Sequence, residues 1–495
     1  MLESLESASV FKFFQEIANI PHGSGNEKQI SDYLVKFAQE NDLDYKRDEY
    51  NNVLIKKQES KGYENTPSII LQAHIDMVCV KTQDSNHDFL KDPLKLVIDK
   101  DKNIIYAKDT SLGADDGIGA AIILALLESK NIGHPELETL FTVDEERSML
   151  GARTFDVSQL KSKILFNLDG EDENCFTAGS GGGLGSEIIY DADYINIKDQ
   201  KDNSDFGLYN FDSYELKIEG LLGGHSAVEI NKEHANAVIL ITRILNELDK
   251  KIDLNLCDIS GGTAGNVIPS SCMAILNIKS KDFELAKEII NKIKKDLELE
   301  FKYSDPGIKI NFVKSKQKYD LVISKEALKK LIGTIFLIPN GLINRNLNLN
   351  GASDTSNNIG VIKIKDNKII ITDFARSSLE SRLDFIFDKL ELISKKFDGE
   401  IKISNRFPAW DYNPDSKLIS FCKKNYESAY GKSPIIDATH GGLECSFFKQ
   451  IPGVEIISMG PNVFDCHSVN EKVEIDSVDR FWRFFKNMIQ ELKNY

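Results

Sequence analysis

Two histidines and four acidic residues stand where an apolar stretch of the chain meets a loop. They are His74, Asp115, Glu145, Glu146, Asp169 and His467. Imidazole nitrogens and carboxylate oxygens in these numbers suit a pair of divalent cations. In an α/β sheet, side chains at the carboxyl ends of strands gather at one edge, even when they are far apart in sequence. The residues therefore predict a metal-assisted hydrolase.

Two short motifs carry most of this argument. Asp76 lies two residues after His74, so on an extended backbone both side chains face the same way, as a metal ligand and its orienting carboxylate require. The adjacent carboxylates of Glu145 and Glu146 repel each other unless a cation or solvent separates them. Each motif alone has a structural alternative, which is a buried histidine, an exposed acidic turn or, at Asp115, a helix cap. Their joint occurrence favours the metal site.

Length and composition exclude several classes of protein. At 495 residues, the chain is long enough for two domains. Its formal net charge of −16 argues against nucleic acid or an anionic membrane as the main partner, because both need basic surface. The seven cysteines form no Cys-x-x-Cys pair, which argues against a disulfide framework and a thiolate zinc site. The start lacks the features of a signal peptide, so we expect a cytoplasmic protein.

Hydrophobic periodicity predicts an α/β domain at the start of the chain. Apolar residues recur at helical spacing over 10–17 and 30–37. Short apolar strands then alternate with an apolar helix, which is typical of a mostly parallel or mixed sheet. The strands are expected at 53–56, 68–73, 139–143 and 164–168, and the helix at 118–127.

The pattern changes after the glycine-rich segment 179–185, where charged residues become more frequent. The expected strands are 214–218, 274–278 and 309–312, and the expected helices are 235–248 and 283–297. Asp366-Asn367 separates two apolar runs and suggests a hairpin. We therefore expect an inserted α+β domain, with a return to α/β character after 406–414. No internal repeat stands out.

These motifs resemble those of the M20 metallopeptidases, specifically the aminoacyl-histidine dipeptidase branch, over essentially the whole chain. The motifs are Ile17-Ala-Asn-Ile-Pro-His22, Gln72-Ala-His-Ile-Asp-Met77, Ser111-Leu-Gly-Ala-Asp-Asp-Gly117, Asp144-Glu-Glu146, Leu168-Asp-Gly-Glu-Asp172, Gly223-Gly-His-Ser226, Arg376-Ser-Ser378, Gly442-Leu-Glu-Cys445 and Cys466-His-Ser468. The resemblance implies a zinc-peptidase-like catalytic domain with a mixed sheet at 1–181 and 408–495. It also implies an inserted lid and dimerisation domain at 182–407.

The same resemblance implies a role for each residue of the metal site. One cation would be held by His74, Asp115 and Asp169, and the other by Asp115, Glu146 and His467. Asp115 would then bridge the pair, and the peptide bond after it would be cis. Asp116 stands where the branch more often has asparagine, and the register favours Asp115 as the bridge. Asp76 would orient His74, and Glu145 would be the general base that activates a hydroxide shared by the cations.

The resemblance also implies substrate contacts. His225 would donate to the oxyanion, from this chain or from a partner subunit. Arg376 would bind the carboxylate of a dipeptide through paired charge-assisted bonds. Asn266 lies in a segment similar to the family's substrate-contacting loop, and Glu444 lies in a motif near the site. An ordinary turn residue is the alternative at His225 and Asn266, and a surface arginine is the alternative at Arg376.

The function expected from the sequence is hydrolysis of dipeptides, with Xaa-His as the expected type. Two zinc ions suit the mixed nitrogen and oxygen ligands, and manganese or cobalt also fit. A broader peptidase or a deacylase of N-acyl amino acids is the second interpretation. A metal-binding scaffold without catalysis is the third, and Glu145 argues against it because such a site has no use for a free base. The expected partners are a small dipeptide and a second copy bound through the lid domain.

Overall fold

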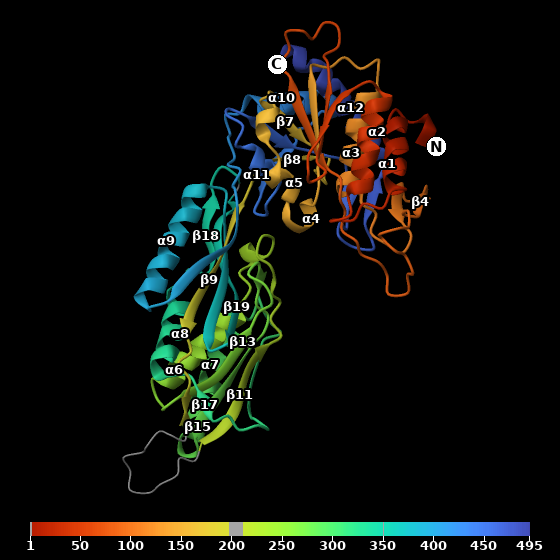
Figure 1. Ribbon diagram of the computed structural model, residues 1–495. Coiled ribbons are helices and arrows are strands. Elements are labelled where there is room, and N and C mark those ends of the chain that lie inside the picture. The colour runs from red at the N-terminus through yellow and green to blue at the C-terminus, as the bar shows by residue number, and fades with distance from the viewer. Residues whose placement is uncertain (1, 198–210, 350) are drawn as a thin grey trace. The chain divides into compact units, whose positions relative to one another are not determined.

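The structure is a computed structural model that describes residues 2–197, 211–349 and 351–495. It divides into two compact units (Figure 1). Unit 1 comprises Met1–Ser180, Trp410–Ala438 and Leu443–Tyr495, and unit 2 comprises Gly181–Ala409 and Thr439–Gly442. Unit 2 is therefore an insertion into unit 1. The short segment Thr439–Gly442 clusters with unit 2, although the sequence analysis placed it in the catalytic domain.

Unit 1 is built on an eight-stranded mixed sheet. Its strands are β1 (Asp44–Arg47), β2 (Val53–Lys57), β3 (Ile69–His74), β6 (Leu137–Thr142), β7 (Ile164–Asn167), β8 (Cys175–Ser180), β22 (Ile435–Thr439) and β23 (Glu455–Ser458). Their order is β1-β2-β6-β3-β7-β23-β8-β22. β3 runs parallel to both β6 and β7. The carboxyl ends of these three neighbouring strands therefore meet at one edge of the sheet.

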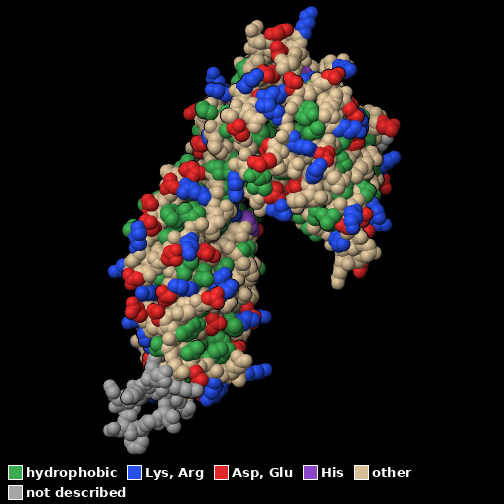
Figure 2. Space-filling model, viewed as in Figure 1, with side chains coloured by type: hydrophobic (Ala, Val, Ile, Leu, Met, Phe, Trp, Pro, Cys, Tyr) green, Lys and Arg blue, Asp and Glu red, His purple; other side chains and the backbone are tan. Residues whose placement is uncertain are grey.

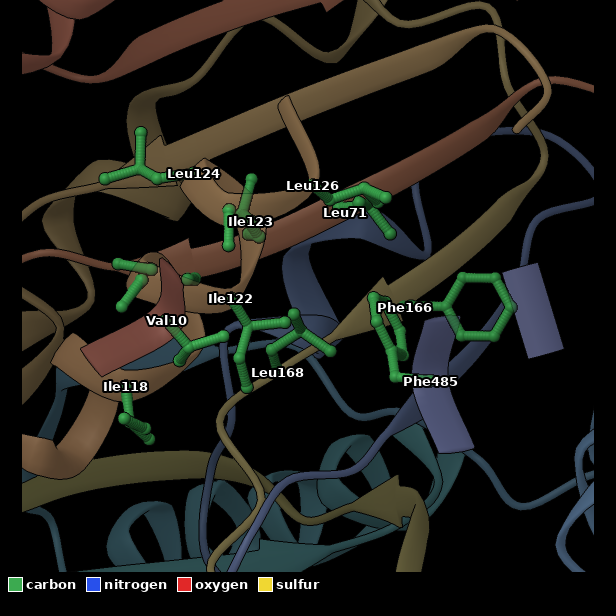
Figure 3. Close-up of a cluster of buried hydrophobic side chains, with 14 of the residues drawn as sticks. Val10, Leu71, Ile118, Ile122, Ile123, Leu124, Leu126, Phe166, Leu168 and Phe485 are labelled. Carbon is green, nitrogen blue, oxygen red and sulfur yellow. The ribbon is translucent and has the colours of Figure 1, made fainter. Parts of the chain in front are cut away.

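One face of this sheet is covered by helices that share a single apolar core with it. The helices are α1 (Ala8–Ala18), α2 (Lys28–Glu40), α3 (Ala114–Glu128), α10 (Lys417–Tyr430) and α12 (Ile475–Glu491). Figure 3 shows Val10 and Ile122 beside Leu168, and Phe166 near Phe485. The shorter helices α5 (Leu150–Thr154) and α11 (Cys445–Phe448) lie toward the other face (Figure 1). The sheet is thus buried on both sides, which explains its continuous apolar strands.

The strands expected at 53–56, 68–73, 139–143 and 164–168 are confirmed as β2, β3, β6 and β7. The expected helix at 118–127 is confirmed as α3, which begins earlier, at Ala114. A second sheet of unit 1 has the order β24-β25-β5-β4. Its strands are β4 (Leu96–Asp99), β5 (Ile104–Ala107), β24 (Val463–Phe464) and β25 (Lys472–Glu474).

Unit 2 contains a nine-stranded sheet with four long helices. The strands are β9 (Gly182–Asp191), β11 (Phe211–Glu219), β13 (Asn255–Gly261), β15 (Cys272–Lys279), β16 (Lys309–Lys314), β18 (Gly341–Asn346), β19 (Ala352–Lys365), β20 (Lys368–Ser377) and β21 (Glu400–Phe407). The helices are α6 (Ala237–Asp249), α7 (Phe283–Glu300), α8 (Lys325–Leu337) and α9 (Glu380–Lys396). The strands and helices that the sequence predicted between 214 and 312 lie within β11, β15, β16, α6 and α7, apart from the first residues of the helix expected at 235.

The sheet of unit 2 consists of two halves with the same construction. Its order, β16-β11-β15-β13-β19-β20-β9-β21, reads as one four-strand pattern followed by its mirror. Each half follows the course strand, helix, two strands, helix, strand, first through β11, α6, β13, β15, α7 and β16. The second half follows it through β9, α8, β19, β20, α9 and β21. The first half is inserted after β9 of the second half, so this duplication was not expected from the sequence.

The predicted hairpin joins β19 to β20. Lys365 pairs with Lys368, and the two residues between them, Asp366 and Asn367, have φ values of 49° and 59°. A two-residue loop with both φ values positive matches the right-handed twist of the strands, and Asp and Asn tolerate it better than most residues. This hairpin is therefore confirmed.

Among the described residues, no helix has both the length and the apolar character needed to cross a bilayer. Figure 2 shows acidic and basic side chains interspersed over the visible face of each unit.

We expect the aromatic contact in Figure 3 to stabilise unit 1. Phe485 is fully buried, and its ring lies edge-on to Phe166 with centroids 6.2 Å apart. Phe485→Ala should lower the free energy of unfolding of unit 1 by about 3–5 kcal/mol, because it removes buried apolar area and leaves a cavity. Urea denaturation measures this change. Phe464→Ala, at a residue that is 42% exposed, is the control and should cost less than about 1 kcal/mol. Equal losses in the two variants would contradict this account of the core.

Candidate metal centre

Three parallel strands bring metal-type ligands to one edge of the sheet of unit 1. His74 is the last residue of β3, and Asp169 lies just after β7. Glu145 and Glu146 begin the short helix α4 (Glu145–Ser148), which follows β6. The sequence predicts these residues at strand ends, and the structure places them there.

Asp115 reaches the same place from a helix. It lies in the first turn of α3 rather than at a strand end, because β5 ends at Ala107 and a loop leads from there to the helix. The peptide bond between Asp115 and Asp116 is cis, as the family resemblance implied. Asp116 takes the capping role that the sequence left open, since its Oδ1 accepts a hydrogen bond from the amide of Gly119 at 3.1 Å. Burial, with the charge of Asp169, raises the pKa of Asp116 well above its usual value.

The carboxylate of Asp115 is shared between two histidines. Its Oδ1 lies 3.1 Å from Nε2 of His74, and its Oδ2 lies 3.1 Å from Nε2 of His467. Asp169 Oδ1 is 3.5 Å from the same nitrogen of His74. Glu146 Oε2 is 3.0 Å from that of His467. The five side chains thus form two groups, each with one imidazole and two carboxylates, that meet at Asp115.

The charges of this cluster call for protons or cations. Hydrogen bonds to Asp115 and Glu146 raise the pKa of His467 to about 11, against the opposing effect of burial. The second carboxylate oxygen of Glu146 is buried and has no hydrogen-bond partner in the part of the chain that the structure describes. Ligand atoms of His74, Asp115 and Glu146 lie within 4.8 Å of one another. Imidazole and carboxylate donors at this spacing fit two adjacent divalent cations.

Asp76 fixes the residues around the centre. Its carboxylate accepts hydrogen bonds from the backbone amides of Glu145, at 3.0 Å, and Glu146, at 3.3 Å, and from the hydroxyl of Ser24, at 2.7 Å. Its Oδ1 lies 3.6 Å from Nδ1 of His74. Burial opposes the charge of Asp76, but His74 and these donors outweigh it and lower its pKa. Asp76 therefore stays ionised and positions both the imidazole and the start of α4.

The side chain of Glu145 makes no hydrogen bond to any residue that the structure describes, although its backbone amide is held by Asp76. Burial raises its pKa well above the usual value. The negative charges of Asp169, Glu444 and Glu146 add to this rise, and His74 opposes it. A free carboxylate beside the ligands, with raised proton affinity, has the properties of a general base.

Glu444, which was predicted to contact substrate, is buried beside the strands that carry the ligands. It is 1% exposed, and its Oε2 accepts hydrogen bonds from Gln72 at 2.7 Å and Thr142 at 2.6 Å. Burial raises its pKa to about 7. These partners belong to β3 and β6, so Glu444 packs against the strands that carry the ligands and supports them from within unit 1. Its other oxygen, Oε1, is buried and has no hydrogen-bond partner among the described residues, and a contact of Glu444 with substrate stays a prediction.

Glu471 is a residue of this centre that no sequence motif singled out. Its buried carboxylate accepts hydrogen bonds from four consecutive backbone amides, Leu112 at 2.7 Å, Gly113 at 3.0 Å, Ala114 at 2.8 Å and Asp115 at 3.3 Å. It lies four residues after His467, which was the only signal in the sequence that could have drawn attention to it. Glu471 therefore clamps the backbone of the shared aspartate to the segment that carries the second histidine.

The other predicted substrate residues belong to unit 2 and lie close together there. Nε2 of His225 is 3.3 Å from Nδ2 of Asn266. The Nε of Arg376 is 3.3 Å from the hydroxyl of Ser226, the residue after His225. The guanidinium also lies over the ring of Phe374, 4.8 Å from its centroid. Burial lowers the pKa of Arg376 to about 10, which leaves it charged at neutral pH.

Comparison with known proteins shows likeness over both units. Residues 216–304 match the family described as peptidase dimerisation domain. The chain is 32% identical over 496 residues to the cytosol non-specific dipeptidase of Escherichia coli (strain K12), with 99% of each chain covered. The solved aminoacylhistidine dipeptidase of Vibrio alginolyticus has 33% identity and a TM-score of 0.89, covering 99% of this chain and 97% of that one. A tripeptidase from Staphylococcus aureus shares the fold, with 16% identity, a TM-score of 0.55, and 99% and 100% of the two chains covered.

The clamp at Glu471 gives a prediction about metal affinity. In Glu471→Gln, the new amide group points its own N–H bonds at backbone donors, so the start of α3 loses its position. We expect the Kd for Zn²⁺ to rise by about 10- to 100-fold, measured by competition with a chromogenic chelator. Glu474→Gln is the control, since that carboxylate pairs with Asn462 and Arg480 instead. An unchanged Kd in Glu471→Gln would show that the clamp has no part in metal binding.

Proposed function

The chain belongs to the M20 family of peptidases, and on that basis we propose that it hydrolyses dipeptides at a two-metal centre in unit 1. The ligands in this proposal are His74, Asp115 and Asp169 for one cation, and Asp115, Glu146 and His467 for the other. The observation that carries the proposal is the shared carboxylate of Asp115, with one oxygen 3.1 Å from each histidine. Zinc suits these nitrogen and oxygen donors, and manganese or cobalt can take the same ligands.

The residues around the centre supply the remaining chemistry. When bound, the cations lower the pKa of water toward neutrality and polarise the substrate carbonyl. Glu145 then accepts the proton of the attacking water and passes it to the departing amine. Asp76 keeps the imidazole of His74 and the backbone of Glu145 in place. These separate roles account for the difference between the two glutamates of α4. Among the described residues the side chain of Glu145 makes no hydrogen bond, whereas that of Glu146 faces His467.

Substrate recognition is assigned to unit 2. Arg376 binds the carboxylate of the dipeptide, and His225, from the same chain or a second copy, donates to the oxyanion with Asn266 beside it. The names of two relatives, one an aminoacylhistidine dipeptidase and one a non-specific dipeptidase, support dipeptides as the substrate class. We propose that Xaa-His dipeptides are among them. An N-acyl amino acid deacylase would differ in that its substrates lack a free α-amine.

The role of Glu145 predicts a loss of turnover without a loss of metal. Glu145→Gln keeps the size of the side chain but cannot accept the proton, so kcat should fall by at least about 100-fold. Hydrolysis of alanyl-histidine and alanyl-leucine by the zinc-loaded protein measures the rate, and elemental analysis measures the metal content.

Glu40→Gln, at an exposed residue that ends α2, is the matched control and should keep the rate. Equal rates in Glu145→Gln and the native protein would remove Glu145 as the base. If the native zinc-loaded protein cleaved neither dipeptide, the proposed function itself would be wrong.

We further propose that two copies pair through the helices of unit 2. The match to a peptidase dimerisation domain includes α6 and α7. Phe336, near the end of α8, is 52% exposed and lines a pocket with Ile289 and Ile293 of α7. Leu337, the next residue, is 56% exposed, and neighbouring apolar side chains that are both exposed mark a surface that another protein covers. A second copy is the partner that the dimerisation-domain match supports.

A charge at this position should separate the copies. Phe336→Glu is expected to convert the dimer to a monomer, because a buried unpaired carboxylate at an interface is unfavourable. Analytical ultracentrifugation measures the mass. Leu347→Glu should leave the dimer intact, because this residue is 91% exposed but follows β18 and does not belong to the helices of the proposed interface. A native protein that sediments as a monomer, or a Phe336→Glu variant that stays dimeric, would contradict this interface.

A further inference from the structure

Unit 2 contains a buried arginine that lacks a counter-ion. Arg376 is 4% exposed, and no carboxylate of the described residues forms an ion pair with it. The nearby acid Asp354 is occupied by Arg382 and by the hydroxyl of Ser378. A buried charge without a partner is unfavourable, so this position calls for an anionic ligand. The ring of Phe374 lies beneath the guanidinium and Nε donates to Ser226, so the two terminal NH2 groups remain to bind an anion.

Two further polar residues stand beside this arginine. Ser356 on β19 is the direct cross-strand partner of Arg376 on β20, so their side chains lie next to each other on one face of the sheet. The hydroxyl of Ser356 lies 2.7 Å from Nε2 of His440. His440 is 7% exposed and belongs to the short segment Thr439–Gly442 that crosses into unit 2. The serine thus holds the imidazole beside the guanidinium.

The imidazole is neutral and has one free nitrogen. Burial lowers the pKa of His440 to about 4, and the positive charge of Arg376 contributes to this shift. Within the described ranges, Nδ1 of His440 has no hydrogen-bond partner, whereas Nε2 is bound to Ser356. If the serine hydroxyl donates to Nε2, the single ring proton must lie on Nδ1. The pocket then presents a guanidinium and a neutral N–H donor side by side.

We propose that His440 binds the C-terminal carboxylate of the dipeptide together with Arg376, and that Ser356 fixes the imidazole tautomer that donates from Nδ1. One cation and one neutral donor match the single negative charge and the two oxygens of a carboxylate. This inference rests on the proposed dipeptidase function and adds a specificity residue to it. It also accounts for the segment Thr439–Gly442, which leaves unit 1 and places His440 in this pocket.

Two substitutions at His440 distinguish the role of Nδ1 from that of Nε2. The amide nitrogen of Asn can occupy the place of Nδ1, whereas that of Gln can occupy the place of Nε2. His440→Gln should therefore raise KM for alanyl-histidine by about 10-fold or more, the effect of losing a hydrogen bond to a charged group, with kcat within about twofold. His440→Asn should raise KM by less than about threefold. Ser356→Ala removes the hydroxyl that fixes the tautomer of His440. Its increase in KM should lie between those of His440→Asn and His440→Gln.

The C-terminal amide of the same dipeptide tests the ligand. It lacks the carboxylate, so the native protein should bind it weakly and His440→Gln should not raise its KM further. His234→Gln is the control in the same unit, because Nδ1 of that histidine lies 2.7 Å from the carbonyl oxygen of Gly223 and, among the described residues, its ring forms no hydrogen bond with Arg376. Thermal midpoints within about 2 °C of the native protein would show that the variants are folded.

Several results would overturn the proposal. An unchanged KM in His440→Gln would show that His440 does not contact the substrate. Equal increases in KM for the free dipeptide and its amide would show that His440 does not bind the carboxylate. Calorimetric titration of alanyl-histidine into zinc-loaded Glu145→Gln, with and without His440→Gln, reports binding without turnover. A lower affinity in the double variant would support the carboxylate contact even if the native protein cleaved no dipeptide, and equal affinities would refute it.

Discussion

The crowding of carboxylates around Asp115 is the constraint on which unit 1 depends. Asp115 faces His74 with one oxygen and His467 with the other, and further carboxylates stand behind each histidine. Negative charges at these separations repel one another in a partly buried site unless protons or cations lie between them. The backbone must therefore hold the ligands in place against their repulsion. Three adjacent parallel strands do so for His74, Glu146 and Asp169, because their ends cannot move apart without breaking the sheet.

Other carboxylates near the centre serve as clamps on the backbone. Asp76 binds the amides at the start of α4, and Glu471 binds those at the start of α3. Backbone N–H groups stabilise an ionised carboxylate without competing for a cation. The acidic residues of unit 1 are thus of two kinds. Asp115, Glu146 and Asp169 offer carboxylate oxygens to the centre. Asp76 and Glu471 instead bind the backbone segments that carry Glu146 and Asp115.

The sheet of unit 2 is built from two halves with the same order of elements. The two halves meet where Ser260 and Gly261 of β13 pair with Lys363 and Ile362 of β19. The dimerisation-domain match covers only the first half, residues 216–304. The second half supplies β19 and β20, whose cross-strand pair Ser356 and Arg376 forms the anion pocket. Ser356 and Arg376 therefore belong to a half of the sheet that the family match does not include, whereas His225 and Asn266 lie within the match.

The sequence by itself determined the main elements and most of the metal-type residues. Strands such as β3 and β7 could be predicted because their apolar runs are strong and local, and His74 and Asp169 could be identified because each follows such a run. The duplication in unit 2 could not, since one half interrupts the other. Glu471, Ser356 and His440 could not be found either, because isolated polar residues carry no periodic signal.

Only the tertiary structure decided which residues lie together at the metal centre or in the pocket around Arg376. Asp115 and His467 are separated by 352 positions in sequence, and His440 and Ser356 by 84, yet each pair is in hydrogen-bonding contact. Hydrophobic periodicity and side-chain chemistry are properties of short segments, so they can be read from the sequence. Distances between remote segments are set by the packing of whole sheets and helices, and no short stretch of the sequence contains that information.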